Sequence, residues 1–209
     1  MKIELERVAP MDIEARSFEI IESELPHPID PALAPIIKRV IHTSADFDYA
    51  DTLCFSESVV EKALAAIREG AVIVTDTTMA MSGINKRALA KHGGEALCFI
   101  GDADVAESAR VNGTTRAVAS MDKAAAIDRP LIFAIGNAPT ALVRICELMA
   151  EGRLNPRLVI GVPVGFVNVV QSKELIMSAG APYIVARGRK GGSNVAAAIC
   201  NALLYLLGR

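Results

Sequence analysis

An arginine and a histidine stand three residues apart at the start of segment 39–49, which reads Arg-Val-Ile-His-Thr-Ser-Ala-Asp-Phe-Asp-Tyr. Residues three apart share a face of a helix, so Arg39 and His42 are expected to point in the same direction. Arginine holds a carboxylate in fork geometry, and histidine exchanges a proton near neutral pH. The pair indicates a carboxylate site beside a proton-transfer group, where a helix ends in a polar loop. A simpler interpretation is that His42 only interacts with the helix dipole.

A second segment that could do chemistry is 187–194, Arg-Gly-Arg-Lys-Gly-Gly-Ser-Asn, which leads directly into an apolar run of helical length. Glycines let backbone N–H groups approach an anion, and a helix N-terminus favours negative charge. The segment therefore predicts a phosphate or carboxylate site near Lys190 and Ser193. It does not match the glycine-rich patterns of dinucleotide or P-loop sites. The structural alternative is a flexible basic turn with Ser193 as the helix cap.

Single polar residues add weaker candidates. Asn137 lies in Gly-Asn-Ala-Pro-Thr after a buried run, where its amide either faces a ligand or belongs to an ordinary helix start. Arg116 follows an Asn-Gly turn, and Arg144 lies on the helix after the Asn137 loop. The four cysteines are far apart and have no adjacent histidine pair, so we expect no metal site.

The elements that must position these residues follow from hydrophobic patterning. Short apolar runs predict strands at 71–75, 96–100, 131–135, 158–162 and 183–186. Segments of helical length lie around and between them, at 56–69, 78–92, 103–111, 138–151, 168–178 and 193–207. This alternation predicts a three-layer α/β/α fold with a mostly parallel sheet of about five strands. Ligands of such sheets bind at the carboxyl ends of the strands, where the polar segments above fall.

Two further helices are expected near 12–25 and 31–42, ahead of the first strand. We therefore expect one domain over residues 1–209, made of a helical N-terminal arm or cap (1–55) and an α/β core (56–209). Composition agrees, because 52% hydrophobic residues exclude a disordered chain and a net charge of −2 disfavours nucleic acid as a partner. The N-terminus has no apolar signal-peptide run, and no stretch is long enough to span a membrane, which predicts a cytoplasmic protein.

Taken together, the motifs resemble the precorrin-8X methylmutase family, including its cobalt-precorrin-8 counterpart, over nearly the whole chain. The resemblance rests on segment 39–47 and on the segments 13–21, 76–84, 136–142, 161–168 and 188–196. It implies an isomerase of corrin-ring biosynthesis that moves a methyl group from C-11 to C-12 of a tetrapyrrole polycarboxylate. The implied product is hydrogenobyrinate, or cobyrinate when cobalt is already inserted. No cofactor is implied, because the substrate already carries the methyl group, and the family is homodimeric with sites near the subunit interface.

The resemblance also implies residue roles. His42 matches the catalytic histidine and is expected to donate and accept a proton, because a methyl shift on a conjugated macrocycle needs an electron-poor ring. Arg16 and Arg39 match substrate-binding positions and are expected to hold acetate and propionate groups. The other expected substrate contacts are Ser17, Thr43, Arg116, Asn137, Lys190 and Ser193. Apolar walls for the flat ligand are expected from Met79, Met81 and Phe166.

Two other functions stay open. A corrinoid carrier without turnover would use the arginines and the basic loop but would not need His42. A nucleotide-dependent α/β enzyme would use residues 187–194 and would bind ATP or NAD, which calorimetry detects.

Overall fold

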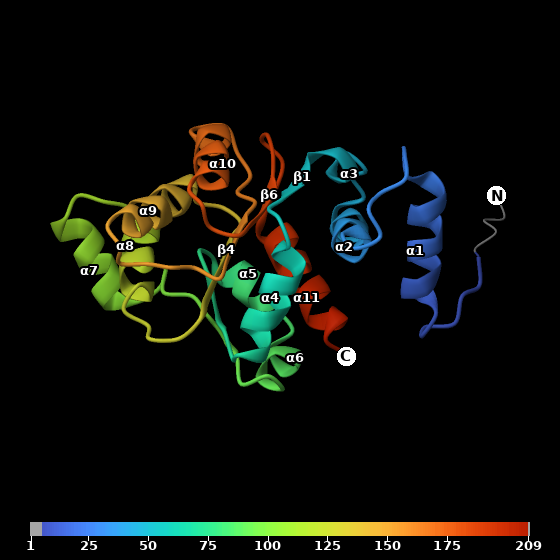
Figure 1. Cartoon of the computed structure of the whole chain (residues 1–209), viewed down its shortest axis with the longest axis horizontal. Coiled ribbons are helices and arrows are strands. Elements are labelled where there is room, and N and C mark those ends of the chain that lie inside the picture. Colours follow the sequence, from blue (N-terminus) through green and yellow to red (C-terminus); the bar gives the residue numbers. More distant parts are fainter. Residues whose placement is uncertain (1–5, 209) are drawn as a thin grey trace, which may run out of the picture.

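The structure is a computed structural model that describes residues 6–208 and contains a six-stranded sheet of order β1-β6-β5-β4-β2-β3 (Figure 1). Neighbouring strands from β2 to β6 are parallel, whereas β1 runs antiparallel to β6. The mostly parallel sheet is thus confirmed. The strands are β1 (Leu53–Phe55), β2 (Val72–Thr75), β3 (Glu95–Leu97), β4 (Leu131–Ile135), β5 (Leu158–Gly161) and β6 (Tyr183–Ala186).

The expected number of about five strands is one too few, because β1 was not predicted. Its three residues are shorter than the run that marks a strand in sequence. Pairing with β6 makes it a strand, with Cys54 opposite Val185.

The helices are α1 (Ile13–Glu24), α2 (Ala34–Ser44), α3 (Tyr49–Thr52), α4 (Val59–Arg68), α5 (Thr78–Gly83), α6 (Lys86–Ala90), α7 (Ala103–Val111), α8 (Arg116–Ala124), α9 (Pro139–Ala150), α10 (Val169–Ser178) and α11 (Ser193–Leu206). The single helix expected over 78–92 is wrong: α5 ends at Gly83, and Asn85 caps α6 by accepting a hydrogen bond from the Ala88 N–H (3.0 Å). Helices α3 and α8 were not predicted. Helix α8 begins after Thr115, whose hydroxyl accepts from the Val118 N–H (3.2 Å).

The sheet separates two hydrophobic cores, which gives the expected three layers. On β2, Ile73 packs into a core shared with α4, α5, α6 and α11, whereas Val72 and Val74 pack into a core shared with α8, α9 and α10. Because alternate strand residues face opposite sides, a sheet buried on both faces needs apolar residues at nearly every position, as in Val72–Thr75 and Leu131–Ile135.

Helices α1 and α2 lie outside α11, at one end of the molecule (Figure 1). Helix α2 turns Ile36, Ile37, Val40 and Ile41 inward against α11, which is buried over most of its length because elements pack on both of its sides. Small residues permit this close packing: a Cβ on Gly83 would lie 2.8 Å from the Cβ of Ala197. Helix α11 therefore connects the sheet to the N-terminal helices.

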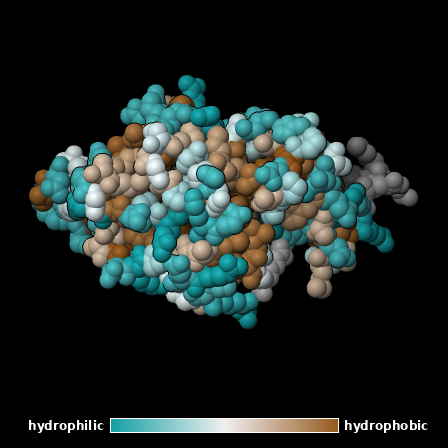
Figure 2. All heavy atoms as spheres, in the orientation of Figure 1, coloured by the Kyte–Doolittle hydropathy of each residue, from teal (hydrophilic) through white to brown (hydrophobic). Residues whose placement is uncertain are grey.

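Hydrophobic and hydrophilic residues are interspersed over the surface in Figure 2. Large apolar side chains that are exposed include Ile13 on α1, Met79 on α5, and Phe166 and Val167 in the loop after β5. Within residues 6–208, no helix combines the length and hydrophobicity that crossing a membrane requires.

Candidate active site

Four loops leave one edge of the sheet after β2, β4, β5 and β6, and we call them the strand-end loops (residues 76–77, 136–138, 162–168 and 187–192). The buried Asp76 ties the first two together. Its Oδ1 accepts a hydrogen bond from the Gly136 N–H (2.9 Å), and its Oδ2 accepts from the N–H groups of Asn137 (2.8 Å) and Ala138 (2.6 Å). Burial raises the pKa of Asp76, and the three N–H donors lower that pKa by a smaller amount.

The last two loops join the same cluster. The Thr77 and Ser193 hydroxyls are 2.7 Å apart, and a Cβ on Gly136 would lie 2.6 Å from the Cα of Ser193. The Gly192 N–H donates to the Val162 carbonyl (2.8 Å). A Cβ on Gly191 would likewise collide with the Val162 carbonyl. Glycine is required where backbones come this close, so the packing explains Gly136 and Gly191 without invoking a nucleotide.

The basic loop, residues 187–192, also reaches the segment that follows α2. Lys190 Nζ lies 2.6 Å from Asp46 Oδ2 and 2.5 Å from Asp48 Oδ2. These carboxylates raise the pKa of Lys190, and the Lys190 ammonium lowers the pKa of Asp46. Because Asp46 follows His42 by four residues, this ion pair links the strand-end loops to the end of α2.

His42 is exposed on the last turn of α2. Its ring centroid lies 5.4 Å from that of Phe18 on α1. The helix stops just beyond, since Ala45 is left-handed (φ 52°). His42 lines a pocket of about 320 Å³ whose other lining residues are Ser17, Ile20, Ile21, Glu24, Ile41, Ala45 and Phe47. A proton-exchanging ring therefore borders a largely apolar pocket between α1 and α2.

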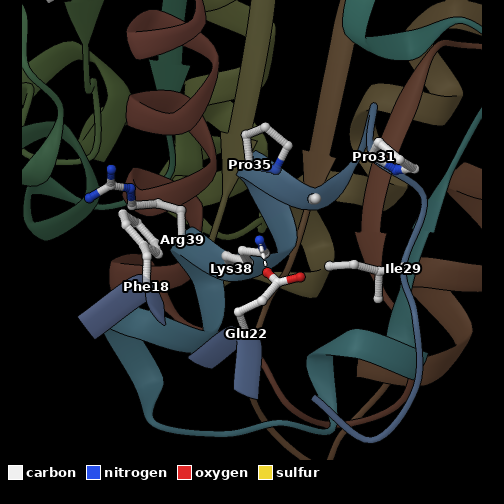
Figure 3. A pocket seen from close by; sticks show the side chains of 8 residues that line it. Phe18, Glu22, Ile29, Pro31, Pro35, Lys38 and Arg39 are labelled. Atoms are coloured by element: carbon white, nitrogen blue, oxygen red, sulfur yellow. Dashed lines mark ion pairs between the residues drawn. The ribbon is translucent and has the colours of Figure 1, made fainter. Parts of the chain in front are cut away.

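Arg39 also contacts Phe18 but does not line this pocket. Its guanidinium carbon is 4.8 Å from the Phe18 ring centroid and 5.2 Å from that of Tyr205, and it forms an ion pair with Glu14. Arg39 and Phe18 line a separate pocket of about 550 Å³, where Lys38 pairs with Glu22 (Figure 3). Arg39 and His42 thus contact one ring but line different pockets.

The other predicted site residues fall into two groups. Near His42, Arg16 pairs with Glu6 (2.8 Å) and Glu19 (3.2 Å), Ser17 donates to the Ile13 carbonyl (2.8 Å), and Thr43 is exposed. At the strand-end loops, the structure brings together Asn137, Lys190 and Ser193. Arg116 is exposed as the first residue of α8, and its neighbour Thr115 lies 3.2 Å from Thr140 at the start of α9.

Four residues that organise this edge are not among the predicted site residues: Phe18, Asp46, Asp76 and Lys173. A polar residue directly after a buried strand is a usable signal for Asp76. Lys173 gives no such signal, because Gln-Ser-Lys-Glu reads as an exposed helical face although the side chain is fully buried. Among residues 6–208, no cluster of three or more His, Cys, Asp or Glu side chains is arranged to hold a metal ion.

The fold and the candidate site together define a class: an α/β protein whose candidate site combines cations, backbone N–H groups and an exposed histidine. A model of the precorrin-8X methylmutase family (CbiC) matches residues 12–206, and the chain belongs to that family. It is 46% identical to the cobalt-precorrin-8 methylmutase of Priestia megaterium, over 95% of this chain and 89% of the relative. It is 48% identical to that of Salmonella typhimurium strain LT2, over 95% and 96%.

A solved structure agrees with these relatives. The crystal structure of precorrin-8X methyl mutase from Thermus thermophilus is 39% identical in sequence, with a TM-score of 0.84 over 93% of this chain and 96% of that one.

Proposed function

We propose that this protein is a methylmutase of cobalamin biosynthesis, which moves a methyl group from C-11 to C-12 of its tetrapyrrole, with His42 as proton donor and acceptor. Membership of the family supports the isomerase activity. The observation that supports the role of His42 is its position, exposed at a pocket and packed against Phe18. Substrate and product are isomers, so a proton given to the macrocycle must return, and one imidazole serves both steps.

We further propose that the substrate contains cobalt, so that cobalt-precorrin-8 gives cobyrinate. Relatives named cobalt-precorrin-8 methylmutase are 46% and 48% identical, whereas the structure named for precorrin-8X is 39% identical. The cobalt would enter and leave as part of the substrate.

The substrate carries many acetate and propionate groups, and the pocket beside His42 is too small to enclose the whole macrocycle. A pocket of about 320 Å³ is at the low end even for drug-sized ligands. We therefore propose that the ring extends from His42 toward the basic loop. Lys190 would then exchange Asp46 and Asp48 for a substrate carboxylate, with Asn137, Ser193 and Arg116 further along the same edge.

Arg16, Ser17, Thr43 and Arg39 would contact the substrate at the α1–α2 end. Arg39 Nε is buried and, among the described residues, has no hydrogen-bond partner. An arginine donor left in this state supports a role in binding a carboxylate arm. The exposed rings and thioethers of Phe166 (81%) and Met79 (69%) offer apolar surface for the flat macrocycle, whereas Met81 is half-buried.

A homodimer and a cytoplasmic location are parts of the same proposal. The exposed apolar side chains of Ile13 and Ile20 on α1 support a surface that a second copy covers. Sedimentation velocity measures the first prediction, and fractionation of the source cells measures the second.

The test is a titration with cobyrinate and with hydrogenobyrinate, followed by visible absorption, together with a turnover assay. We expect a saturable shift for wild type and for His42→Ala, with turnover of His42→Ala lowered by a factor of about 100 to 10,000, the range typical of a general acid–base group. His92→Ala is the matched control and should behave as wild type, because His92 lies beyond α6 and away from the strand-end loops. Full turnover in His42→Ala would remove the assigned role. If wild type shows neither a spectral shift nor turnover, the proposed methylmutase function is wrong. If wild type binds without turnover, a corrinoid carrier is favoured.

A further inference from the structure

Helix α10 contains a lysine whose side chain is fully buried. Lys173 is 0% exposed and lies at mid-helix, in contact with the basic loop. Lysine is almost never buried to this extent without a carboxylate, because a charge loses its hydration. Among the described residues no ion pair with Lys173 is present. Its Nζ instead donates to the backbone carbonyls of Gly188 and Lys190, both at 2.8 Å.

The two carbonyls fix the orientation of two peptide groups in the basic loop. A trans peptide unit is planar, with its C=O and N–H pointing in opposite directions. When the carbonyls of Gly188 and Lys190 point at Lys173, the N–H groups of Arg189 and Gly191 must point away from it. Within residues 6–208 neither of these N–H groups donates a hydrogen bond.

The loop is held on its other side by further contacts. The Gly192 N–H donates to Val162 (2.8 Å), and the Arg189 carbonyl accepts from the Gly165 N–H (3.2 Å). The side chain of Lys190 contacts Asp46 and Asp48. Within residues 6–208, these contacts leave the N–H groups of Gly188, Arg189, Lys190 and Gly191 without an acceptor. Those of Arg189 and Gly191 belong to the two peptide groups that Lys173 holds by their carbonyls.

We propose that Lys173 is a positioning residue that holds the N–H groups of Arg189 and Gly191 outward to bind one carboxylate arm of the tetrapyrrole. The inference rests on the proposed function, and it adds a backbone site that the side chains alone do not indicate. Backbone N–H groups gathered in one loop form an anion-binding concavity, and hydrogen bonds to a charged acceptor are stronger than neutral ones. An apolar residue of similar size at position 173 would fill the same volume without the cost of a buried ammonium. Space filling therefore does not account for the lysine, whereas its hydrogen bonds to the Gly188 and Lys190 carbonyls do.

Burial also lowers the pKa of Lys173 to about 8. Because this value is still above 7, the side chain is mostly protonated at neutral pH and donates to its two carbonyl acceptors. This agrees with a group whose hydrogen bonds, rather than a counter-ion, retain it in the interior.

The first experiment compares Lys173→Met with wild type in cobyrinate titrations and in turnover. Methionine has a similar length and no donors, so the loop peptides become free to turn. We expect the dissociation constant and the KM to rise tenfold or more while kcat stays within about threefold, since losing one hydrogen bond to a charged group lowers affinity by at least that factor. Lys173→Arg keeps donors at this position and should recover part of the affinity. Unchanged affinity in Lys173→Met would overturn the inference while leaving the methylmutase assignment intact.

Two controls separate positioning from general destabilisation. Lys62→Met removes another lysine hydrogen bond to a backbone carbonyl, that of Glu57 (2.9 Å), at an exposed site on α4. Leu148→Ala removes a fully buried side chain from α9 and lowers stability away from the loop. Both should bind product as wild type does. Weakened binding in Leu148→Ala equal to that in Lys173→Met would overturn the inference.

A second comparison is independent of whether Lys173→Met folds. Arg189→Pro removes the N–H donor together with the side chain, whereas Arg189→Ala removes only the side chain. We expect Arg189→Pro to bind cobyrinate at least fivefold more weakly than Arg189→Ala. Equal affinities would show that the Arg189 N–H does not bind the ligand, and would overturn the backbone site even if wild type turns over normally.

Discussion

We expect the Asp76 carboxylate to contribute several kilocalories per mole to the free energy of unfolding. The reason is that this one buried side chain accepts hydrogen bonds from three consecutive backbone N–H groups. The perturbation is Asp76→Asn, which keeps the shape but replaces one oxygen with an NH₂ donor. The amide keeps the most hydrogen bonds if its oxygen takes the Oδ2 position, where it still accepts from the N–H groups of Asn137 and Ala138. Its NH₂ group then faces the Gly136 N–H, donor against donor, in the protein interior.

The magnitude follows from these contacts. One charge-assisted hydrogen bond is lost, the Gly136 N–H becomes an unsatisfied buried donor, and the two remaining bonds lose the charge that strengthens them. With about 1.5–3 kcal/mol for a hydrogen bond to a charged group, we expect a loss of about 3 kcal/mol in the free energy of unfolding. A contribution of opposite sign comes from the cost of burying the Asp76 charge, which also raises the pKa of Asp76. The neutral variant does not carry this cost.

The assay is equilibrium urea unfolding at pH 7, in which the midpoint should fall with an unchanged slope. The control is Asp128→Asn at an exposed carboxylate, for which a change within about 0.5 kcal/mol is expected. A stability of Asp76→Asn equal to or above wild type would refute the reasoning, because the relief of burial would then outweigh the three hydrogen bonds. In folded Asp76→Asn, weaker cobyrinate binding is expected because the Asn137 loop is no longer fixed.

Two other predictions test single positions. Gly136→Ala should destabilise the fold by about 1–3 kcal/mol in urea unfolding, since its Cβ would lie 2.6 Å from the Cα of Ser193, whereas Gly101→Ala, with nothing within 4 Å, should be close to neutral. His27 donates hydrogen bonds to the Pro28 carbonyl (3.0 Å) and to the Asp51 carboxylate (2.7 Å), and both raise its pKa. Its contribution to stability is therefore fully present below the unfolded pKa of about 6.5 and is lost as pH rises through the higher folded value. Urea midpoints of wild type and Asp51→Asn should converge between pH 5.5 and 8.5, and parallel curves would count against the pair.

The inner strands β2, β4 and β5 were predictable from sequence because they are buried on both faces. Runs such as Leu131–Ile135 leave no exposed positions, so they consist of apolar residues that are easily read. The strand-end loops followed from the same reasoning, since parallel strands deliver their next residues to one edge. This is why Asn137, Lys190 and Ser193 could be grouped before any contact was known.

Features that depend on distant partners were not predictable in this way. The strand β1 exists because of β6, and the Lys190 contacts depend on Asp46 and Asp48, more than 140 residues earlier in the chain. The separation of Arg39 from His42 has the same origin. Their spacing places both on one side of α2, where both contact Phe18 of α1, yet Arg39 and His42 line different pockets.

The antiparallel pairing of β1 with β6 has a consequence for the order of assembly. Helix α2 packs on α11, and β1 lies at the edge of the described sheet beside β6, so the region around His42 is supported by the last elements of the chain. During synthesis from the N-terminus, His42 emerges from the ribosome well before residues 183–206 that anchor it. Until α11 has been synthesised, Ile36, Ile37 and Val40 of the α2 segment have no helix to pack against and remain exposed. This state favours chaperone binding or aggregation. Completion of the candidate site is thereby coupled to completion of the chain. Variants that slow the folding of α11 should therefore lower the yield of folded protein more strongly than they lower its free energy of unfolding.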